Sequence, residues 1–377
     1  MFYRDTWVEI DLDRIYHNVS HIKAFSGFEH LFAVVKANAY SHGDIEVARV
    51  ALEAGASHLA VAFLDEALAL RKQFPQTKIL VMGPIRPSDL QHAAEQQITV
   101  TTHDLAWVDA IADYRGPRAD IHIKLDTGMN RIGLLGPEQF EQALNQLRQH
   151  PAVNLCGLFS HFATADCLDD YYQQQTRAFD ALVEGIDLSQ FEIVHQSNSA
   201  GMLRHGKQQH SNGGRLGIAM YGLPPSDDLE LPFELQQAFS LHARITQLKT
   251  VPGGAKVGYA ASYEATTEER IATLPLGYAD GWLRYHQGRD VEVAGRRFPI
   301  VGRVCMDQCM IRVDDQVQLG DQVTLLGDLI SVTDAADDLN TINYEIVCSI
   351  SDRVPRLYKR GGQVIGERYD RFETRNR

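Results

Sequence analysis

The chain has 377 residues, 44% hydrophobic and 23% charged, which is ordinary for a folded protein with enough material for two domains or for one large barrel with an appendage. It carries 36 basic and 49 acidic residues, a formal charge of −13. Because so acidic a surface repels phosphate backbones and anionic lipid, we expect no nucleic acid and no membrane among its partners.

From about residue 31 to 220, a short apolar run repeatedly precedes a stretch with the periodicity of an amphipathic helix. The apolar runs are 31–37, 58–64, 78–83, 98–102, 120–126, 154–162 and 191–197, with a weaker eighth near Gly213 to Arg215. The helical stretches between them include 44–55, 65–74, 87–97 and 137–150. Such alternation predicts a parallel sheet covered by helices. Eight units favour a closed (β/α)8 barrel over an open doubly wound sheet, whose phosphate-binding glycine motif is also missing.

After about residue 235 the pattern changes to short strands separated by Gly, Pro and Asp turns. These strands are expected within 241–251, 270–277, 290–295, 297–305, 309–314 and 321–327, and residues 223–232 are the expected linker. The predicted fold class is therefore α/β: an N-terminal (β/α)8 TIM-type barrel over residues 1–234 and a C-terminal all-β domain over 235–377. Although the first residues of the chain are counted with the barrel in this division, they can pack on the β domain.

The five cysteines are irregularly spaced and form no C-x-x-C pair, which indicates free thiols rather than a disulfide framework or a zinc site, and we expect no metal. The N-terminus, MFYRDTWVEIDLDRI, has no uninterrupted apolar core of the kind found in signal peptides. No apolar run approaches the length that spans a bilayer. The sequence thus predicts a soluble, cytoplasmic protein.

The active sites of (β/α)8 barrels lie at the C-terminal ends of the strands. The polar residues that end the predicted strands are Lys36 with Tyr40, Lys124 with Asp126 and Arg131, His161, Asn198 with Ser199, and Arg215. Dehydration by the barrel wall lowers the pKa of an ammonium group, so Lys36 is a candidate Schiff-base amine. Taken alone, a lysine at this position is more often a solvated loop residue.

The segment AVVKANAYSHG resembles the motif with which alanine racemases bind pyridoxal 5'-phosphate (PLP) through a lysine. Further segments match that family in the same order: KLDTGMNRIG, SHFATAD, NSAGML, RLGIAMYGL, GYADGW, GRVCMDQCM and NYEIVCSISDRVPR. The resemblance runs from near residue 8 to near 358, and so many ordered motifs rarely coincide by chance. It implies a barrel followed by a β domain, which the pattern of elements predicts independently.

The resemblance implies a role for each matching residue. Lys36 would hold PLP as a Schiff base and serve as one catalytic base, and Tyr259 from the other subunit of a homodimer would be the second base. Bases on opposite faces of Cα exchange the proton without rotating the substrate. The implied cofactor-binding residues are Lys36, Tyr40, His161, Asn198, Ser199, Arg215, Gly217 and Ile218. Among them Arg215 would face the pyridine nitrogen, supported from behind by His161.

On the substrate side, the resemblance implies that Arg131 binds the substrate carboxylate or the cofactor phenolate. Met306, through its backbone, and Tyr278 would contact the substrate from the β domain. Tyr278, together with Arg284, Arg303 and Asp166, also resembles the family's substrate access path, for which an ordinary surface salt-bridge cluster is the alternative. Lys124 aligns with a lysine that the family often carries as a carbamate. Such a group would orient Arg131, and an unmodified lysine paired with Asp126 is the alternative.

The chain departs from the family pattern at three positions. Ser41 and Ala260 stand where glycine is usual, and both changes need only a tolerant backbone angle. Asp352 stands where well-known members place a tyrosine near the phosphate. A carboxylate there must turn away, pair with a cation or face the substrate. Because the smaller side chain leaves room for a hydroxymethyl group, Asp352 is a possible specificity position.

The expected function is that of an alanine racemase, a PLP-dependent isomerase that interconverts L- and D-alanine by two bases and supplies D-alanine for peptidoglycan. The expected partners are a small amino-acid substrate and a second copy of the chain in a homodimer with shared active sites. One alternative is a serine or broader small-amino-acid racemase. Two alternatives are less favoured. One is a PLP decarboxylase of the same two-domain plan, because Cys305 and Asp307 would mimic the cysteine and aspartate of its active site. The other is a non-enzymatic PLP carrier.

Overall fold

The computed structural model describes residues 2–369, and the chain divides into two compact units. The barrel unit comprises Ile15–Ala39 and Asp44–Gln236. The sheet unit comprises Tyr40–Gly43 and the described parts of Met1–Arg14 and Gln237–Arg377. The short segment that follows Lys36 therefore belongs to the sheet unit, although the chain on either side of it belongs to the barrel unit.

The barrel unit, all of which is described, contains eight parallel strands in the order β4-β3-β2-β10-β9-β8-β6-β5. Their bounds are β2 (His30–Val34), β3 (His58–Val61), β4 (Lys78–Val81), β5 (Val100–Thr102), β6 (Ala119–Asp126), β8 (Val153–Phe159), β9 (Ile193–His195) and β10 (Gly213–Leu216). A further strand, β7 (Leu134–Leu135), pairs with β6. A parallel bridge between Leu80 and Thr99 joins the two ends of this order, so the barrel is nearly closed. The predicted (β/α)8 barrel is confirmed.

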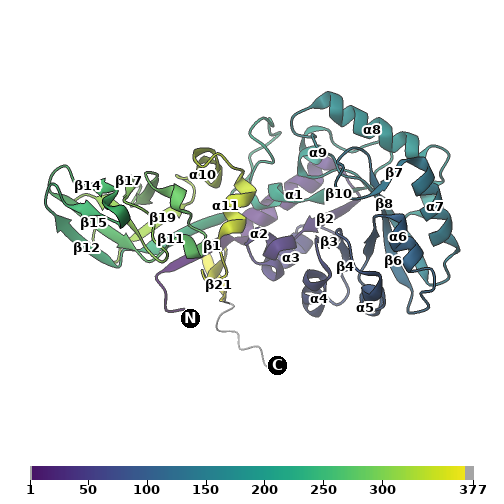
Figure 1. Ribbon diagram of the computed structural model, residues 1–377, viewed down its shortest axis with the longest axis horizontal. Coiled ribbons are helices and arrows are strands. Elements are labelled where there is room, and N and C mark those ends of the chain that lie inside the picture. The colour runs from purple at the N-terminus through teal and green to yellow at the C-terminus, as the bar shows by residue number, and fades with distance from the viewer. Residues whose placement is uncertain (1, 370–377) are drawn as a thin grey trace. The chain divides into compact units, whose positions relative to one another are not determined.

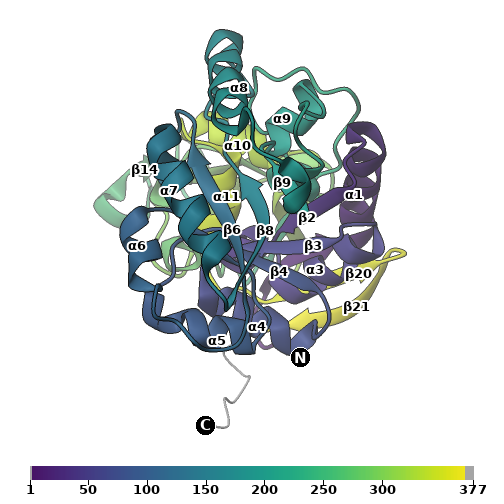
Figure 2. The same ribbon diagram turned by 90° about the vertical axis from the view of Figure 1, so that its right-hand side faces the viewer.

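Helices surround these strands (Figures 1 and 2). They are α1 (Leu12–Ser26), α2 (Lys36–Tyr40), α3 (Asp44–Glu53), α4 (Leu64–Gln73), α5 (Leu90–Glu95), α6 (Leu105–Ala110), α7 (Gly136–Gln149), α8 (Asp169–Val183) and α9 (Ser199–Arg204), with 3-10 turns η1 (Pro87–Asp89), η2 (Leu188–Gln190) and η3 (Ile218–Tyr221). Helix α7 illustrates the pattern that predicts them, because Phe140, Ala143, Leu144 and Leu147 are buried at helical spacing. This shell fixes the C-terminal strand ends from which the candidate residues project.

The sheet unit is built on ten strands between residues 6 and 368, in the order β12-β15-β18-β17-β16-β19-β11-β1-β20-β21. Their bounds are β1 (Thr6–Asp11), β11 (Phe239–Arg244), β12 (Gln247–Val251), β15 (Glu269–Leu274), β16 (Asp290–Val293), β17 (Arg296–Val301), β18 (Cys309–Val313), β19 (Gln322–Leu326), β20 (Arg356–Arg360) and β21 (Gln363–Arg368). The N-terminal strand β1 lies between β11 and β20. A separate hairpin pairs β13 (Lys256–Val257) with β14 (Tyr263–Glu264), and the loops contain η4 (Tyr259–Ala261), η5 (Tyr278–Asp280) and η6 (Arg284–His286).

The sheet unit also carries helices α10 (Val332–Asp338) and α11 (Asn343–Ser349), whereas the sequence predicts only strands in this region. Ser331 caps α10 by accepting a hydrogen bond from the amide of Asp334, whose side chain returns a bond to the Ser331 amide. This capping box is visible in the sequence as Ser-x-x-Asp. All five cysteines are free. None of the helices within residues 2–369 has the length and apolar character needed to cross a membrane.

Candidate functional site

Lys36 follows the first barrel strand and opens a left-handed turn. Ala37, Asn38 and Ala39 have φ of 53°, 53° and 51°, and the left-handed region continues through Tyr40 and Ser41. Left-handed helical conformation costs a residue with a side chain about 1–2 kcal/mol, so the turn is strained. Strain of this kind persists only where surrounding contacts impose it, and it concentrates at functional sites.

Two side-chain contacts within the barrel unit hold this turn. The amide of Ala37 donates to Glu66 Oε1 at 2.6 Å, and the amide of Asp44 donates to Asn38 Oδ1 at 3.1 Å. The Ala39 amide also donates to the carbonyl of Val35 at 2.9 Å. Side-chain and backbone hydrogen bonds therefore both hold the turn that follows Lys36.

Arg215 on β10 is buried and almost fully engaged. Its Nη1 donates to His195 Nδ1 at 2.7 Å and to the His195 carbonyl at 3.1 Å. Its Nη2 donates to the carbonyls of Ser160 and Gln196 at 2.9 Å and to His161 Nδ1 at 3.0 Å. The remaining N–H, on Nε, makes no hydrogen bond to any residue in the described part of the chain. A buried guanidinium with one free donor suits a ligand that presents an acceptor atom.

The histidines around Arg215 are neutral. Burial, and then the charge of Arg215, lowers the pKa of His161 and of His195 well below the ordinary histidine value. Burial likewise lowers the pKa of Arg215, to about 9, so the arginine keeps its charge at neutral pH. No carboxylate hydrogen-bonds to Arg215 among the described residues, so backbone carbonyls and neutral histidines take the place of a counter-ion.

Hydrogen-bond directions assign the tautomers of a row of histidines in the barrel interior. Because Arg215 donates to Nδ1 of His195, the proton of that neutral ring is on Nε2. This Nε2 lies 3.0 Å from Nδ1 of His122, which must therefore accept. The pKa of His122 is lowered to about 3, by burial first. Neither ring is predicted from the sequence, although His122 precedes Lys124 by two residues on β6 and so shares its face of the strand.

Lys124 on β6 is buried beside other cations. Burial first, and then the charges of Arg215 and Arg131, lower its pKa to about 7. Lys36 also contributes to this shift. The nitrogen of Lys124 lies 5.2 Å from the ring centre of Phe159. The structure thus brings Lys36, Lys124, Arg131 and Arg215 together at the strand ends, as their positions in the sequence predict.

Asp126 organises the loop that carries Arg131. Its Oδ1 accepts from the amides of Gly128 at 2.9 Å and Asn130 at 3.0 Å, and its Oδ2 accepts from the amide of Arg131 at 3.2 Å. The carboxylate is thereby occupied by backbone donors. Its charge also acts on Lys124, where it partly offsets the lowering of that pKa.

The ends of β9 and β10 bring the starts of two short helical segments together. Asn198 caps α9 by accepting from the amide of Gly201 at 3.0 Å. The amide of Gly217, which precedes η3, donates to Ser199 Oγ at 2.9 Å. Ser199 and Ile218 are buried. Because the side chains of Asn198 and Ser199 already accept from the amides of Gly201 and Gly217, an anionic group here would be bound by the Ser199 hydroxyl and the start of η3.

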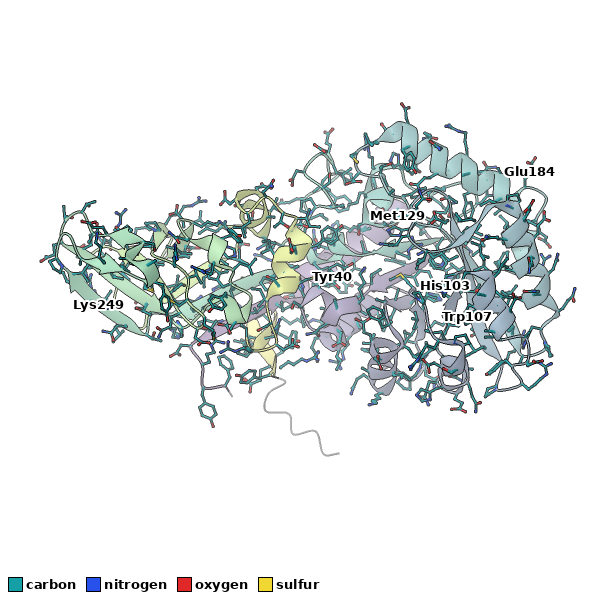
Figure 3. All side chains as sticks on the ribbon, in the orientation of Figure 1. Tyr40, His103, Trp107, Met129, Glu184 and Lys249 are labelled. Carbon is teal, nitrogen blue, oxygen red and sulfur yellow. The ribbon has the colours of Figure 1, made fainter. Side chains whose placement is uncertain are left out.

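In the sheet unit, Tyr40 is buried against α11, with its ring centre 6.1 Å from that of Tyr344 (Figure 3). Burial raises the pKa of the Tyr40 phenol, which therefore stays protonated. The next residue, Ser41, donates to the carbonyl of Ile350 at 2.7 Å. Arg356 donates to the Ser41 hydroxyl at 2.9 Å and to the Ser41 carbonyl at 3.0 Å.

The other candidates of the sheet unit are exposed in the single chain. Tyr259 in η4 is 70% exposed and Met306 is 54% exposed, and Tyr278 is also exposed. Backbone hydrogen bonds tie the Tyr278 segment to the Met306 segment: Tyr278 donates to the carbonyl of Cys305, and Ala279 to that of Met306, both at 3.0 Å. These side chains are therefore accessible to a second molecule.

Asp352 pairs with a cation, which is one of the three outcomes that its charge allows. Its Oδ1 lies 3.8 Å from Nη1 of the buried Arg356, and its side chain is 63% exposed. Arg356 is also the residue that holds Ser41. Within residues 2–369, no group of three or more His, Cys, Asp or Glu side chains is arranged to hold a metal ion.

Comparison with known proteins gives one consistent result. Family profiles described as "Alanine racemase, N-terminal domain" and "Alanine racemase, C-terminal domain" match residues 10–225 and 238–358. Alanine racemase of Anoxybacillus flavithermus is 49% identical over 377 residues, covering 97% of both chains. That of Geobacillus stearothermophilus is 48% identical over 374 residues, covering 97% of this chain and 96% of the relative.

Solved structures give the same picture. Alanine racemase from Bacillus anthracis with bound L-Ala-P superposes with a TM-score of 0.92 at 45% identity, covering 98% of both chains. A histidine racemase from Leuconostoc mesenteroides subsp. sake superposes with a TM-score of 0.90 at 31% identity, covering 96% of this chain and 99% of that one. The same architecture therefore occurs in racemases named for substrates with side chains of different size.

Proposed function

Because this chain belongs to the alanine racemase family, we propose that it interconverts L- and D-alanine with PLP as its cofactor. The observation that carries the proposal is the cluster at the barrel strand ends. In this cluster the charges of Arg215, Arg131 and Lys36 all lower the pKa of Lys124, which supports a shared site, and the buried Arg215 has one N–H, on Nε, with no acceptor among the described residues. The family membership favours this reading over a decarboxylase or a non-enzymatic carrier.

The residues of the cluster fit PLP. The Nε–H of Arg215 matches the pyridine nitrogen, and the Ser199 hydroxyl with the start of η3 at Gly217 and Ile218 matches the phosphate. Lys36 would hold the cofactor covalently, with Asn198 shaping the phosphate end. Membership of the family, rather than a contact in the structure, assigns Tyr40 to the phosphate as well. When bound, PLP supplies an electron sink that acidifies the α-hydrogen of an attached amino acid.

The chain's own residues then move the proton. We propose that the Lys36 amine takes or returns the proton at Cα on one face of the substrate, and that the phenol oxygen of Tyr259 of the partner subunit does so on the other. Arg131 binds the substrate carboxylate, and Tyr278 with the Met306 backbone confines the substrate side chain. An arginine does not give its proton to the pyridine nitrogen, so Arg215 keeps the electron sink weak. This favours reprotonation over side reactions.

The exposure of Tyr259 and Met306 supports a two-fold homodimer in which the sheet unit of each subunit completes the site of the other. We further propose that Lys124 carries a carbamate. An amine with a pKa of about 7 is largely neutral in mildly alkaline buffer and adds carbon dioxide readily, and the resulting anion would pair with Arg131. By likeness to its bacterial relatives, we place the protein in the cytoplasm, where it supplies D-alanine for peptidoglycan.

A second candidate function, a racemase that also accepts serine or other small polar amino acids, is favoured by Asp352. Its carboxylate replaces a bulkier aromatic residue and is held by Arg356. Extra volume and a polar group at a substrate wall weaken discrimination against a hydroxymethyl side chain.

The test is α-hydrogen exchange in deuterated buffer with L-alanine and L-serine, followed by chiral chromatography and mass spectrometry. Rapid formation of deuterated D-alanine with slow reaction of serine is the expected result. Comparable rates would identify the broader racemase, and no exchange with either substrate would refute both. The Lys36→Ala variant should be colourless and inactive, and a yellow, active variant would contradict the assignment of Lys36.

A further inference from the structure

We propose that Asp280 and Arg353 are positioning residues that hold the three substrate-facing loops of the sheet unit in a fixed arrangement. The three loops carry Tyr278, Met306 and Asp352. The proposal rests on the proposed function, which assigns these three residues to the substrate side. Neither Asp280 nor Arg353 is itself expected to touch the substrate.

Asp280 is a fully buried carboxylate at the end of η5. Arg4 approaches it with both terminal nitrogens, Nη1 at 2.5 Å from Oδ1 and Nη2 in contact with Oδ2. The carboxylate also accepts from the amide of Gly277 at 3.0 Å, while the Asp280 amide donates to the Gly277 carbonyl at the same distance. A buried carboxylate is costly unless cations and donors surround it, and here they do. The turn that carries Tyr278 is thus closed on Asp280.

Close backbone approach joins this turn to the Met306 loop. Besides the bonds from Tyr278 and Ala279 to the carbonyls of Cys305 and Met306, Gly277 packs directly on this loop. A Cβ at Gly277 would lie 2.3 Å from the Cys305 carbonyl oxygen and 2.4 Å from that of Met306. Only glycine allows such an approach. A shift of either loop would therefore move the other.

The same turn is joined to the loop that precedes Asp352. Ser351 donates its amide to the carbonyl of Asp280 at 3.0 Å. Gly281, with φ of +94°, lies so close that an added Cβ would be 2.0 Å from the Ser349 carbonyl oxygen. One turn is therefore in contact with both other loops.

Arg353 completes the arrangement through its side chain. Its Nε lies 3.5 Å from Asp280 Oδ1, and its Nη2 donates to Asp307 Oδ1 at 2.8 Å. Arg353 follows Asp352 in the chain, and Asp307 follows Met306. One guanidinium thus couples the immediate neighbours of two substrate-facing residues to the turn that carries the third. A lysine, with one nitrogen, cannot span two carboxylates in this way.

The experiment compares Arg353→Gln, Arg353→Lys and Asp307→Asn with the wild-type holoenzyme. These variants leave Asp280 paired with Arg4, so the core of the network persists. We expect KM for L-alanine to rise roughly fivefold or more while kcat changes by less than about threefold, because loss of a positioned binding surface weakens substrate binding. The effects of Arg353→Gln and Asp307→Asn should not add in the double variant, since both remove the same bridge.

The matched control is Arg14→Gln. Arg14 pairs with Asp328 in the same unit and is 33% exposed, against 31% for Arg353. The control should keep wild-type KM. Hydrogen exchange supplies a readout that does not depend on turnover: the amides of Tyr278 and Ala279 should exchange faster in Arg353→Gln and at the wild-type rate in Arg14→Gln.

An unchanged KM in the Arg353 variants, or an equal rise in the control, would overturn the proposal. A wild-type KM in Arg353→Lys combined with a raised KM in Arg353→Gln would also overturn it, because the positive charge rather than the bridge between two carboxylates would then matter. A wild-type enzyme that fails to racemise alanine would refute the proposed function instead. In that case the exchange rates of the two amides still decide whether the loops are coupled.

Discussion

Replacing His122 with leucine tests whether the histidine row behind Arg215 sets the orientation of that arginine. The ring of His195 donates from Nε2 to Nδ1 of His122 and accepts on Nδ1 from Arg215. Leucine removes the acceptor and leaves a buried N–H without a partner. Alternatively, the proton of His195 moves to Nδ1 and faces the Arg215 donor that now lies 2.7 Å away. Either outcome disturbs the arginine.

The expected loss is about 1–3 kcal/mol in the free energy of unfolding, the cost of one unsatisfied buried donor. Because leucine also changes the shape of the packed side chain, the matched control is His122→Asn, whose amide oxygen takes the place of Nδ1. The asparagine variant should retain more stability and activity than the leucine variant, although it is smaller. Urea unfolding of the PLP-free protein, kcat, and nitrogen NMR of the His195 ring measure these effects.

Three results would contradict the role given to His122. The first is a leucine variant that matches the wild type in both stability and kcat. The second is an NMR spectrum in which His195 of the wild type carries its proton on Nδ1, because Arg215 then has no acceptor there. The third is a loss of stability and kcat that His122→Asn shares in full, since the effect would then come from packing rather than from the lost acceptor.

Three further predictions concern the proposed chemistry. Since the pKa of Lys124 is lowered to about 7, the folded protein binds fewer protons than the unfolded chain between pH 7 and the ordinary lysine pKa of 10.5. The free energy of unfolding should therefore rise with pH across this window. Carbon-13 NMR in labelled bicarbonate should show a bound carbamate above pH 7. A lysine that titrates normally with no bound label would contradict this. Mixing Lys36→Ala and Tyr259→Phe subunits should restore part of the activity through hybrid dimers with one intact site, and no recovery despite subunit exchange would count against a shared site. Asp352→Tyr should lower the ratio of serine to alanine turnover, and an unchanged ratio would remove Asp352 as a specificity position.

The barrel was predictable because its strands are buried on both faces and so read as continuous apolar runs. The eighth strand, β10, gave a weak signal for a physical reason. A Cβ at Gly213 would lie 2.7 Å from the side chain of Ile193, and one at Gly214 would lie 2.9 Å from Phe28. Tight packing thus requires glycine where a strand pattern expects branched residues.

The site was predictable as a set of strand-end residues but not as a network. The contact from Arg215 to His195 joins residues 20 apart in the chain, and that from His195 to His122 joins residues 73 apart. Neither spacing leaves a local signal. The left-handed turn after Lys36 was equally hidden, because Ala37, Asn38 and Ala39 include no glycine to mark it. The roles assigned to these residues remain predictions.

The two positions where the chain lacks the family's glycine show what such a substitution requires. Ser41 and Ala260 both adopt left-handed backbone, with φ of 68° and 59°, at a cost of about 1 kcal/mol each relative to glycine. Ser41 offsets this cost, because its hydroxyl donates to Ile350 and accepts from Arg356. Ala260 has no polar side-chain atom with which to do so.

Ala260→Gly should therefore raise the free energy of unfolding by about 1 kcal/mol, whereas Ser41→Gly should lower it, since the relief of strain is outweighed by two lost buried hydrogen bonds. Thermal or urea midpoints of the two variants, measured beside the wild type, decide the matter. Stabilisation by both glycines would mean that the Ser41 hydrogen bonds contribute little. Destabilisation by Ala260→Gly would mean that the η4 turn is held in its left-handed form by contacts that glycine weakens.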